Sequence, residues 1–269
     1  MFKLLTQILI LAVFFIFSSQ EILAQSNSYE LLKQEYYKQF DEYKVALDKY
    51  NHDRAEYLKF ETLVSQSVAL ETTKTFLIER NDVLVAYLRL IKERLEQTPL
   101  LTEEELGKKI IYINEEIEFI NEQTPTILAA ASLKDIESVS KKIQTRYGRF
   151  LRETFFMKSL IVISKVRSLR QTTRELETLT NEQVARIEKE GAINTLEINR
   201  WLLEVPAKIN LSEETETNAI SSYKPSNSAN YNQQSSAYKN FINRLDKSVQ
   251  YLEEAQSLLS QIIQNIRYN

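Results

Sequence analysis

Aromatic side chains recur at a fixed spacing near the start of the chain. In residues 29–57, which read YELLKQEYYKQFDEYKVALDKYNHDRAEY, every seventh residue is a tyrosine, and Val64 continues the row. Positions seven apart lie on nearly the same side of an α-helix. The pattern therefore predicts one helix over residues 25–64 whose tyrosines pack in a seam against a neighbouring helix. Alternatively, an open edge of the row would offer its rings to a ligand such as a glycan.

A second sevenfold row follows, shifted by one position from the first. Its members are Leu70, Leu77, Leu84 and Ile91. Val64 and Leu70 are six positions apart, and polar residues 65–67 lie where the phase changes. A bend or short loop is therefore predicted at 65–67. The second helix is predicted to end at Thr98, because a residue that precedes proline is disfavoured in the α region.

Capping patterns predict where the next helices begin. Thr102 with Glu105 three positions later is a capping box, and Thr124 followed by Pro125 fits an N-cap with proline in the first turn. Isoleucines at alternating steps of four and three lie between these two starts. Two further antiparallel helices are therefore predicted, with short connections.

The remaining boundaries are predicted from the same kinds of signal. Apolar residues at helical spacing continue from Leu133 to Leu179, and a break is allowed at 180–183, where Thr180 and Gln183 repeat the capping pattern. The following helix is predicted to stop before Pro206. Ser212 is predicted to cap a short helix after it.

A polar segment separates these helices from the C-terminal pattern. Residues 221–236 are rich in Ser, Asn and Gln, which predicts a flexible linker. Steps of four and three then alternate over residues 237–269, which is typical of a coiled-coil seam. Its members are Phe241, Leu245, Ser248, Leu252, Ala255, Leu259, Ile262 and Ile266. This helix is predicted to pack either back on the bundle or on a partner chain.

These elements together predict an all-α fold, an elongated antiparallel helical bundle with coiled-coil-like seams, formed mainly by residues 25–220. The composition supports this class, because only 3 glycines and 4 prolines are available for turns in 269 residues. Each stripe needs a cover, since isolated helices of this kind are marginally stable in water.

The first 24 residues have the pattern of a secretory signal peptide. Lys3 precedes an uninterrupted apolar run at 8–17, and Ala24 offers a small residue for cleavage. The alternative is an uncleaved anchor, but a bilayer core requires about 20 apolar residues. Residues 1–24 therefore predict export, to the periplasm, the cell surface or the medium.

The charges are unevenly distributed although their sum is only −3. Residues 141–174 contain ten lysines and arginines and the single acid Glu153, while residues 103–122 and 175–190 are rich in glutamate. One interpretation is that acidic helices lie beside the basic one inside the bundle. The other is that Arg167, Arg170 and Arg174 bind anionic lipid or a wall polymer, because basic and apolar residues mix here as in an interfacial helix.

Residues that usually carry catalysis are scarce. The chain has no cysteine, His52 is its only histidine, and no glycine-rich phosphate loop occurs. The neighbouring acids Glu115, Glu116 and Glu118 are interpreted as a solvated face. No catalytic, metal-binding or cofactor-binding residue is predicted, and the protein is not expected to be an enzyme.

The leading hypothesis is an exported, non-enzymatic helical scaffold or protein-binding protein of the cell envelope, which binds a protein partner or a second copy of itself by helix packing. The alternative is a peripheral envelope protein that binds anionic lipid or polymer through residues 141–174. Nucleic acid is not an expected partner, because residues 29–61 have balanced charge. The candidate interaction surface consists of Tyr29, Tyr36, Tyr43, Tyr50, Tyr57, Arg167, Arg170 and Arg174.

Overall fold

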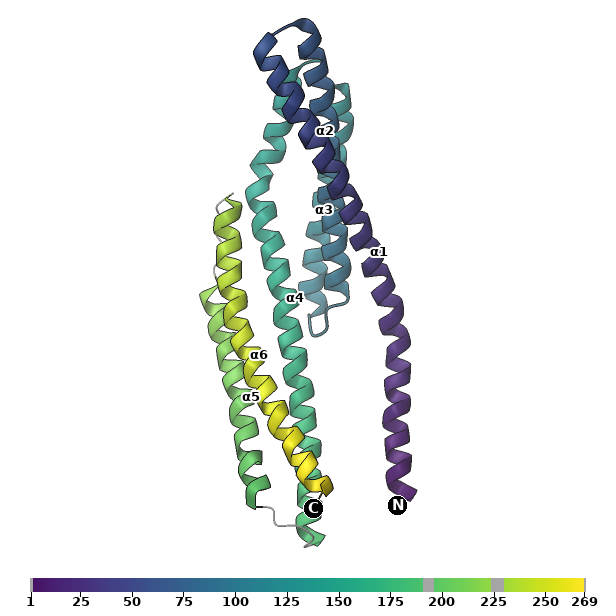
Figure 1. Ribbon diagram of the computed structural model, residues 1–269, viewed down its shortest axis with the longest axis vertical. Helices are drawn as coiled ribbons and strands as arrows, with labels where there is room; N and C mark the ends of the chain where they lie inside the picture. Colours follow the sequence, from purple (N-terminus) through teal and green to yellow (C-terminus); the bar gives the residue numbers. More distant parts are fainter. Residues whose placement is uncertain (1, 191–195, 224–229, 269) are drawn as a thin grey trace. The chain divides into compact units, whose positions relative to one another are not determined.

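The computed structural model describes the backbone of residues 2–190, 196–223 and 230–268, and the side chains of residues 28–189, 197–223 and 230–266. Within these ranges the chain forms helices and no strand (Figure 1). The helices are α1 (Phe2–Phe60), α2 (Leu63–Glu96), α3 (Glu103–Ala129), α4 (Leu133–Glu190), α5 (Leu196–Ser222) and α6 (Tyr231–Tyr268). The predicted all-α helical bundle is confirmed. The side chains of the predicted signal peptide, residues 1–24, lie outside the described residues, so export stays a prediction.

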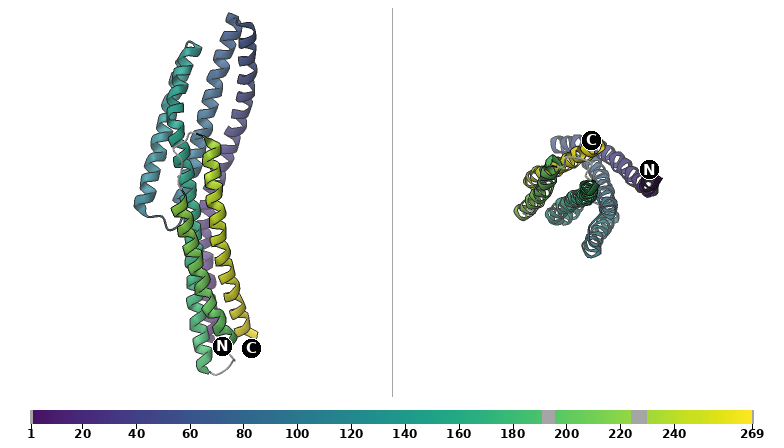
Figure 2. Two further views of the ribbon diagram at one scale, coloured as in Figure 1. Left: turned by 90° about the vertical axis from the view of Figure 1, so that its left-hand side faces the viewer. Right: turned by 90° about the horizontal axis from the view of Figure 1, so that it is seen from below.

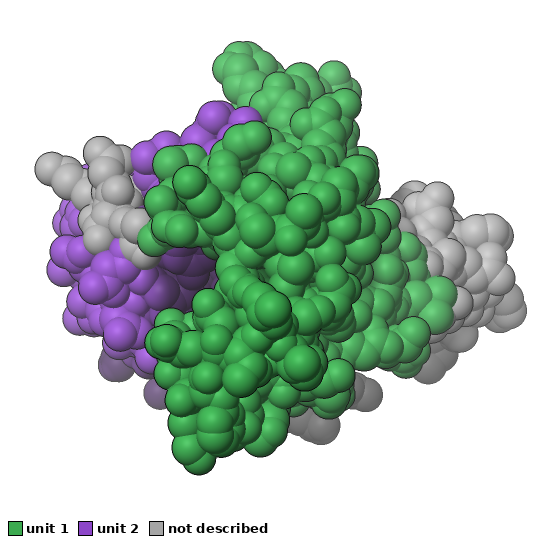
Figure 3. All heavy atoms as spheres, turned by 90° about the horizontal axis from the view of Figure 1, so that it is seen from above, with its two compact units in different colours: residues 1–97, 103–145 green, residues 98–102, 146–269 purple. Residues whose placement is uncertain are grey.

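The chain divides into two compact units, which Figure 3 colours separately. Unit 1 comprises Met1–Gln97 and Glu103–Thr145, and unit 2 comprises Thr98–Thr102 and Arg146–Asn269. Helix α4 therefore supplies its first turns to unit 1 and the remainder to unit 2. Each unit has buried apolar clusters of its own.

In unit 1, helices α1 and α2 form an antiparallel hairpin. The ring centroids of Tyr36 and Tyr87 are 5.5 Å apart, and those of Tyr50 and Phe76 are 4.8 Å apart. A higher residue number in α1 thus pairs with a lower one in α2, as in an antiparallel pair. The tyrosine row of α1 thus faces α2. The predicted packing seam exists within this hairpin.

The turn of the hairpin lies at residues 61–62, before the serine-rich stretch 65–67 where the sequence predicts it. Glu61 adopts a left-handed backbone conformation with φ of 48°. The Thr62 Oγ1 accepts a hydrogen bond from the Ser65 N–H at 3.1 Å, and the Ser65 Oγ accepts one from the Thr62 N–H at 3.1 Å. This reciprocal cap satisfies two backbone donors at the start of α2. The prediction of a bend at 65–67 is wrong, because Ser65 belongs to the cap of α2.

Replacing Thr62 with alanine is expected to destabilise the first turn of α2 by about 1 kcal/mol, because the Ser65 N–H loses its acceptor. Hydrogen–deuterium exchange of the amides of residues 63–70 measures the effect. The control is Ser67→Ala, which changes an exposed residue inside the same helix and should leave exchange almost unchanged. Equal exchange in the two variants would contradict a stabilising role for the cap.

The core of unit 1 lies where α2, α3 and the first turns of α4 meet. In the predicted row of α2, Leu77 and Ile91 are buried and Leu70 and Leu84 are half-buried; Leu88 and Leu95 of the same helix are also buried. The residues that form the buried cluster are Leu77, Ile127, Ala130, Ile136 and Val139.

Helix α3 continues through Pro125, where the sequence predicts the start of a new helix. A proline inside a helix removes one backbone hydrogen bond and costs about 3 kcal/mol. Gln123 and Ile127 are buried on either side of it. Burying a large aliphatic side chain such as Ile127 contributes about 1.5–3 kcal/mol, which offsets much of that cost. The predicted boundary at Thr124 is therefore wrong.

The real boundary between α3 and α4 is capped by a serine and an aspartate. The Ser132 Oγ accepts a hydrogen bond from the Asp135 N–H at 3.2 Å, and the Asp135 carboxylate accepts one from the Ala131 N–H at 3.1 Å. The hydrogen bond from the Ser132 hydroxyl, followed by those from the backbone, lowers the pKa of Asp135. The reciprocal arrangement fixes the start of α4 at Leu133.

Helix α4 shows no break at 180–183, so that prediction is also wrong. Thr180 is buried, and its Oγ1 donates a hydrogen bond to the Leu176 carbonyl at 2.8 Å. Its hydroxyl is therefore satisfied inside α4 and does not cap a new helix. Val184 stays in α4 and packs with Ile198 and Ile262 in unit 2.

Helix α5 passes through Pro206, where the sequence predicts a helix end. Val205 and Ile209 flank the proline and are almost completely buried, in one cluster with Val166 of α4 and Leu252 of α6. Their burial contributes about 1.5–3 kcal/mol each, against about 3 kcal/mol for the proline. The helix therefore continues because its flanking residues pack on two other helices.

Ser212 is also placed differently from its prediction as a helix cap. It is fully buried in the middle of α5, and its Oγ lies 2.8 Å from the Oγ of Ser248 in α6. The Ser248 hydroxyl also donates to the Ser212 carbonyl at 2.8 Å. This hydrogen-bonded pair explains why the heptad of α6 tolerates a serine at a buried position.

The polar linker is shorter than the predicted 221–236. Helix α5 ends at Ser222 and α6 begins at Tyr231, and residues 224–229 lie outside the described residues. The Asn230 Oδ1 accepts a hydrogen bond from the Asn232 N–H at 3.0 Å, which caps α6. Gln234 is fully buried although the composition predicts exposure.

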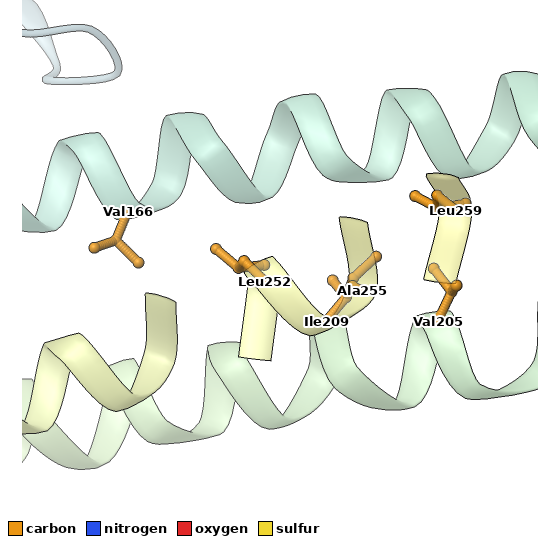
Figure 4. Packing of buried hydrophobic residues seen from close by; sticks show 6 residues of the cluster. All are labelled: Val166, Val205, Ile209, Leu252, Ala255 and Leu259. Atoms are coloured by element: carbon orange, nitrogen blue, oxygen red, sulfur yellow. The ribbon is translucent and has the colours of Figure 1, made fainter. Parts of the chain in front are cut away.

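Helix α6 packs within the chain, against α5 and α4. Figures 1 and 2 show α5 and α6 side by side, and in Figure 4 side chains of α4, α5 and α6 point toward one another. Lys208 and Glu254 form an ion pair of 2.5 Å between α5 and α6. Seven of the eight heptad positions are buried: Phe241, Leu245, Ser248, Leu252, Ala255, Leu259 and Ile262.

Candidate interaction sites

The central tyrosines of the predicted surface are half-buried in the α1–α2 hairpin. Tyr43 and Tyr50 both contact the ring of Phe76, at centroid distances of 5.7 and 4.8 Å. Tyr36 contacts Tyr87 at 5.5 Å. These rings stabilise the hairpin through packing that aromatic pairs favour.

The two outer tyrosines have different surroundings. The ring of Tyr29 lies 4.9 Å from the guanidinium carbon of Arg94 in α2, a cation–π contact. Tyr57 is half-buried near the hairpin turn and lines a cavity. The structure thus brings all five tyrosines of the predicted surface to one side of α1, and whether they also bind a ligand stays a prediction.

The three arginines of the predicted surface pair with two acids of α5. The Arg167 Nε donates to the Glu216 carboxylate at 2.8 Å, and Arg170 binds the other oxygen of the same carboxylate. Arg174 pairs with Glu213 at 2.6 Å. Arg170 and Glu216 are both buried, whereas Arg174 and Glu213 are exposed. The acids that pair with these arginines come from α5, and not from the acidic segments 103–122 and 175–190.

The tip of the α1–α2 hairpin carries an apolar surface that the sequence does not predict. Leu63 is 84% exposed and Val64 is 75% exposed. Phe60 and Val68 are also exposed, and we call these four residues the hairpin tip. The tyrosine pattern misleads at this point, because it counts Val64 as a member of the buried row. The capping pattern Thr62-x-x-Ser65 is the signal from which the turn is predictable.

A groove of about 300 Å³ lies at the hairpin tip. One carboxylate oxygen of Asp53 is buried without a hydrogen-bond partner in the described part of the chain. The groove is lined by Asp53, Glu56, Phe60, Thr62, Val64, Ser65 and Val68.

A larger cavity of about 450 Å³ lies elsewhere in unit 1, between α1, α2 and the start of α4. We call it the arginine cavity, because Arg54 and Arg80 both line it. Neither arginine is singled out by its position in the sequence. The other lining residues are Tyr50, Tyr57, Leu58, Ala69, Thr73, Phe76, Leu77, Leu133, Ile136, Glu137 and Ser140.

Groups that could perform acid–base or metal chemistry are dispersed. His52 is exposed on α1. Glu115 and Glu118 are exposed as predicted, but Glu116 is buried on α3, so the interpretation of all three as a solvated face is wrong for that residue. Across the described side chains, no three His, Asp or Glu residues are grouped so that they could hold a metal ion.

Lys158 interrupts the apolar run of α4 and is partly buried. Its Nζ lies 5.4 Å from the ring centroid of Phe155 and 5.8 Å from that of Tyr238. Burial lowers the pKa of Lys158, because the charged form loses hydration. The two rings give the ammonium cation–π partners.

The chain matches no known protein family, no curated protein and no solved structure. In the portion of the chain that the structure describes, no helix has both the length and the hydropathy needed to cross a bilayer.

Proposed function

We propose that this protein is an exported, non-enzymatic helical binding protein of the cell envelope, and that the hairpin tip holds a protein partner. The observation that carries the proposal is the exposure of Phe60, Leu63, Val64 and Val68 at one turn between two long helices. Large apolar side chains that cluster on a surface mark interaction sites more often than singly exposed ones do.

The chemistry of the tip favours a polypeptide with apolar and basic side chains. The groove beside the tip combines Phe60, Val64 and Val68 with the acids Asp53 and Glu56. Asp53 lines the groove, and its carboxylate, with one oxygen unpartnered among the described residues, favours a basic donor on a partner. An apolar anchor with a neighbouring lysine or arginine satisfies both features.

An anionic membrane surface is a weaker match to the tip. Anionic lipids attract clusters of lysine and arginine, whereas the chain next to the tip carries Lys59 together with the acids Asp53, Glu56 and Glu61. The three arginines of the alternative site on α4 already form ion pairs within the chain, since Arg167 and Arg170 pair with Glu216 and Arg174 pairs with Glu213.

The export part of the proposal is supported by the sequence alone. Lys3, the apolar run at 8–17 and Ala24 form the pattern of a secretory signal. Fractionation of cells that produce the chain, with N-terminal sequencing of the product, tests it. Recovery of the chain from the cytosolic fraction, with residues 1–24 still attached, would contradict export.

A photo-crosslinking residue at Leu63 is expected to capture a protein in the native envelope. The same residue at Leu203 of α5 is the matched control, because Leu203 is 77% exposed but lies outside the tip. Adding Val64→Asp and Val68→Asp should reduce the Leu63 adduct about tenfold, which corresponds to a loss of about 1.4 kcal/mol in binding. Circular dichroism should show unchanged helix content.

The outcomes separate the alternatives. An adduct at twice the chain mass identifies a second copy as the partner. Equal adducts from Leu63 and Leu203, or adducts that persist in the Val64→Asp, Val68→Asp variant, would overturn the tip as the binding surface. Salt-sensitive flotation with anionic liposomes, lost on Arg167→Glu, would support the lipid-binding alternative.

A further inference from the structure

Arg80 of α2 places a positive charge in the lining of the arginine cavity, and no carboxylate among the described residues pairs with it. Its Nε atom is buried and has no hydrogen-bond partner. One Nη atom reaches the Asn81 Oδ1 at 3.4 Å, a long contact to a neutral group. Burial lowers the pKa of Arg80, and Tyr43 acts in the opposite direction. Apart from the contact with Asn81, none of the guanidinium donors of Arg80 bonds to an acceptor among the described residues.

The rest of the lining leaves the cavity positive. Arg54 of α1 lines it and has no ion-pair partner among the described side chains. Glu137 of α4 also lines it, but this carboxylate is engaged by Lys141 at 2.7 Å, which lowers the pKa of Glu137. Glu137 is the one acid among the residues given for the lining, and its pairing with Lys141 leaves the two arginines without an ion pair to it.

The remaining surface is aromatic and aliphatic. The rings of Tyr50 and Phe76 stack with centroids 4.8 Å apart and planes at 12°. Leu77 and Ile136 add buried aliphatic contacts, and both belong to the core of unit 1. The volume of about 450 Å³ falls in the range of small-molecule sites, which is roughly 300–1,000 Å³.

We propose that the arginine cavity binds a small organic carboxylate with an aromatic body, held at its head by Arg80 and Arg54 and at its body by Tyr50 and Phe76. A planar guanidinium binds a carboxylate through two parallel hydrogen bonds, which gives both strength and orientation. A flat body fits beside the stacked rings. This site is separate from the hairpin tip and does not depend on the proposed function.

The test compares two probes of nearly the same shape, 2-naphthoate and its neutral amide 2-naphthamide. Both are titrated into the full chain, with binding followed by saturation-transfer NMR and calorimetry. The chain is expected to bind one equivalent of naphthoate at least about tenfold more tightly than naphthamide, because a hydrogen bond to a charged group is stronger than one to a neutral group. Equal affinities, or no saturable binding of naphthoate, would overturn the proposal.

Arg80→Met is expected to abolish the preference for naphthoate and to leave the binding of naphthamide nearly unchanged. Removing an unpaired buried charge should not destabilise the free protein, so a merely structural arginine would not produce this pattern. The control is Arg200→Met, which removes an exposed arginine paired with Glu204 in unit 2. The Arg200→Met variant should keep the wild-type preference for naphthoate. An equal loss of that preference in Arg80→Met and Arg200→Met would overturn the proposed site.

A second variant keeps the proposal testable if the Arg80→Met protein does not fold. Arg54→Gln changes an exposed side chain of the same cavity and should reduce naphthoate affinity about threefold to tenfold without loss of helix content. Unchanged affinity in Arg54→Gln, together with an unfolded Arg80→Met, would count against the proposal.

Discussion

Replacing Glu216 with glutamine is expected to lower the free energy of unfolding of unit 2 by about 3–5 kcal/mol. Glu216 is buried on α5 and binds two arginines of α4, Arg167 at 2.8 Å and the buried Arg170. The glutamine keeps the shape of the side chain but removes its charge. The guanidinium of Arg170 is then left buried without a counter-charge, and this desolvation dominates the cost.

The matched control is Glu213→Gln, one turn earlier on the same helix. Glu213 pairs with Arg174 at 2.6 Å, but both side chains are about half exposed. Exposed pairs contribute about 0–1 kcal/mol, so this variant should unfold almost like the wild type. Urea unfolding followed by fluorescence measures both, because the only tryptophan, Trp201, packs in unit 2.

A double variant separates charge burial from lost packing. Arg170→Met with Glu216→Gln should recover a large part of the stability that Glu216→Gln loses, because no unpaired charge remains on Arg170. Equal and small losses for Glu216→Gln and Glu213→Gln would contradict the expectation. That result would mean that the buried pair does not hold α4 against α5.

Truncating Leu252 to alanine is the second change with a large expected effect, about 2–5 kcal/mol of lost stability. Leu252 of α6 is fully buried and packs with Val166, Val205 and Ile209 of α4 and α5 (Figure 4). The truncation removes apolar contacts and leaves a cavity that three helices surround. The spread of the estimate reflects how far those helices relax into the space.

Ile263→Ala provides the control for this truncation. Ile263 lies on the same helix and is 43% exposed, so its replacement should change stability by only about 0.5 kcal/mol. The urea midpoint should also be the same at two protein concentrations, because α6 packs within its own chain. Similar losses in both variants, or a midpoint that rises with concentration, would indicate that α6 packs on a second copy instead.

The seam of α6 could be predicted residue by residue from the sequence. Leu245, Leu252, Leu259 and the other members follow the 4–3 pattern, and a helix converts that spacing directly into one face. The packing of the tyrosine row against α2 follows for the same reason. These predictions succeed because they depend only on the order of residues along one helix.

The boundaries at prolines and threonines were less predictable. Pro125 and Pro206 lie inside helices, and Thr180 bonds to its own helix. Local rules count the hydrogen bond that a proline loses, but they do not count the burial of Val205 and Ile209 against other helices. Burial depends on which helices are neighbours, and a local pattern does not contain that information.

The same contrast between local sequence pattern and packing between helices applies to the two candidate sites. The exposure of Leu63 and Val64 depends on a turn placed at residues 61–62, ahead of the bend predicted at 65–67. The unpaired charge of Arg80 depends on which side chains of α1 and α4 face it. The turn has a local signal in the Thr62-x-x-Ser65 cap, whereas the surroundings of Arg80 are a relation between helices.

The order of residues by itself determined that this chain is helical, which face of each helix is apolar and where the C-terminal heptad runs. Only the tertiary structure decided that Arg170 faces Glu216, that α6 packs within the chain, and that Arg80 lines a cavity with no acid partner among the described side chains. The physical reason is the separation along the chain of the residues that interact. Periodicity is set by neighbours a few residues apart, whereas charge pairing and cavities are set by residues that meet only after the helices have packed.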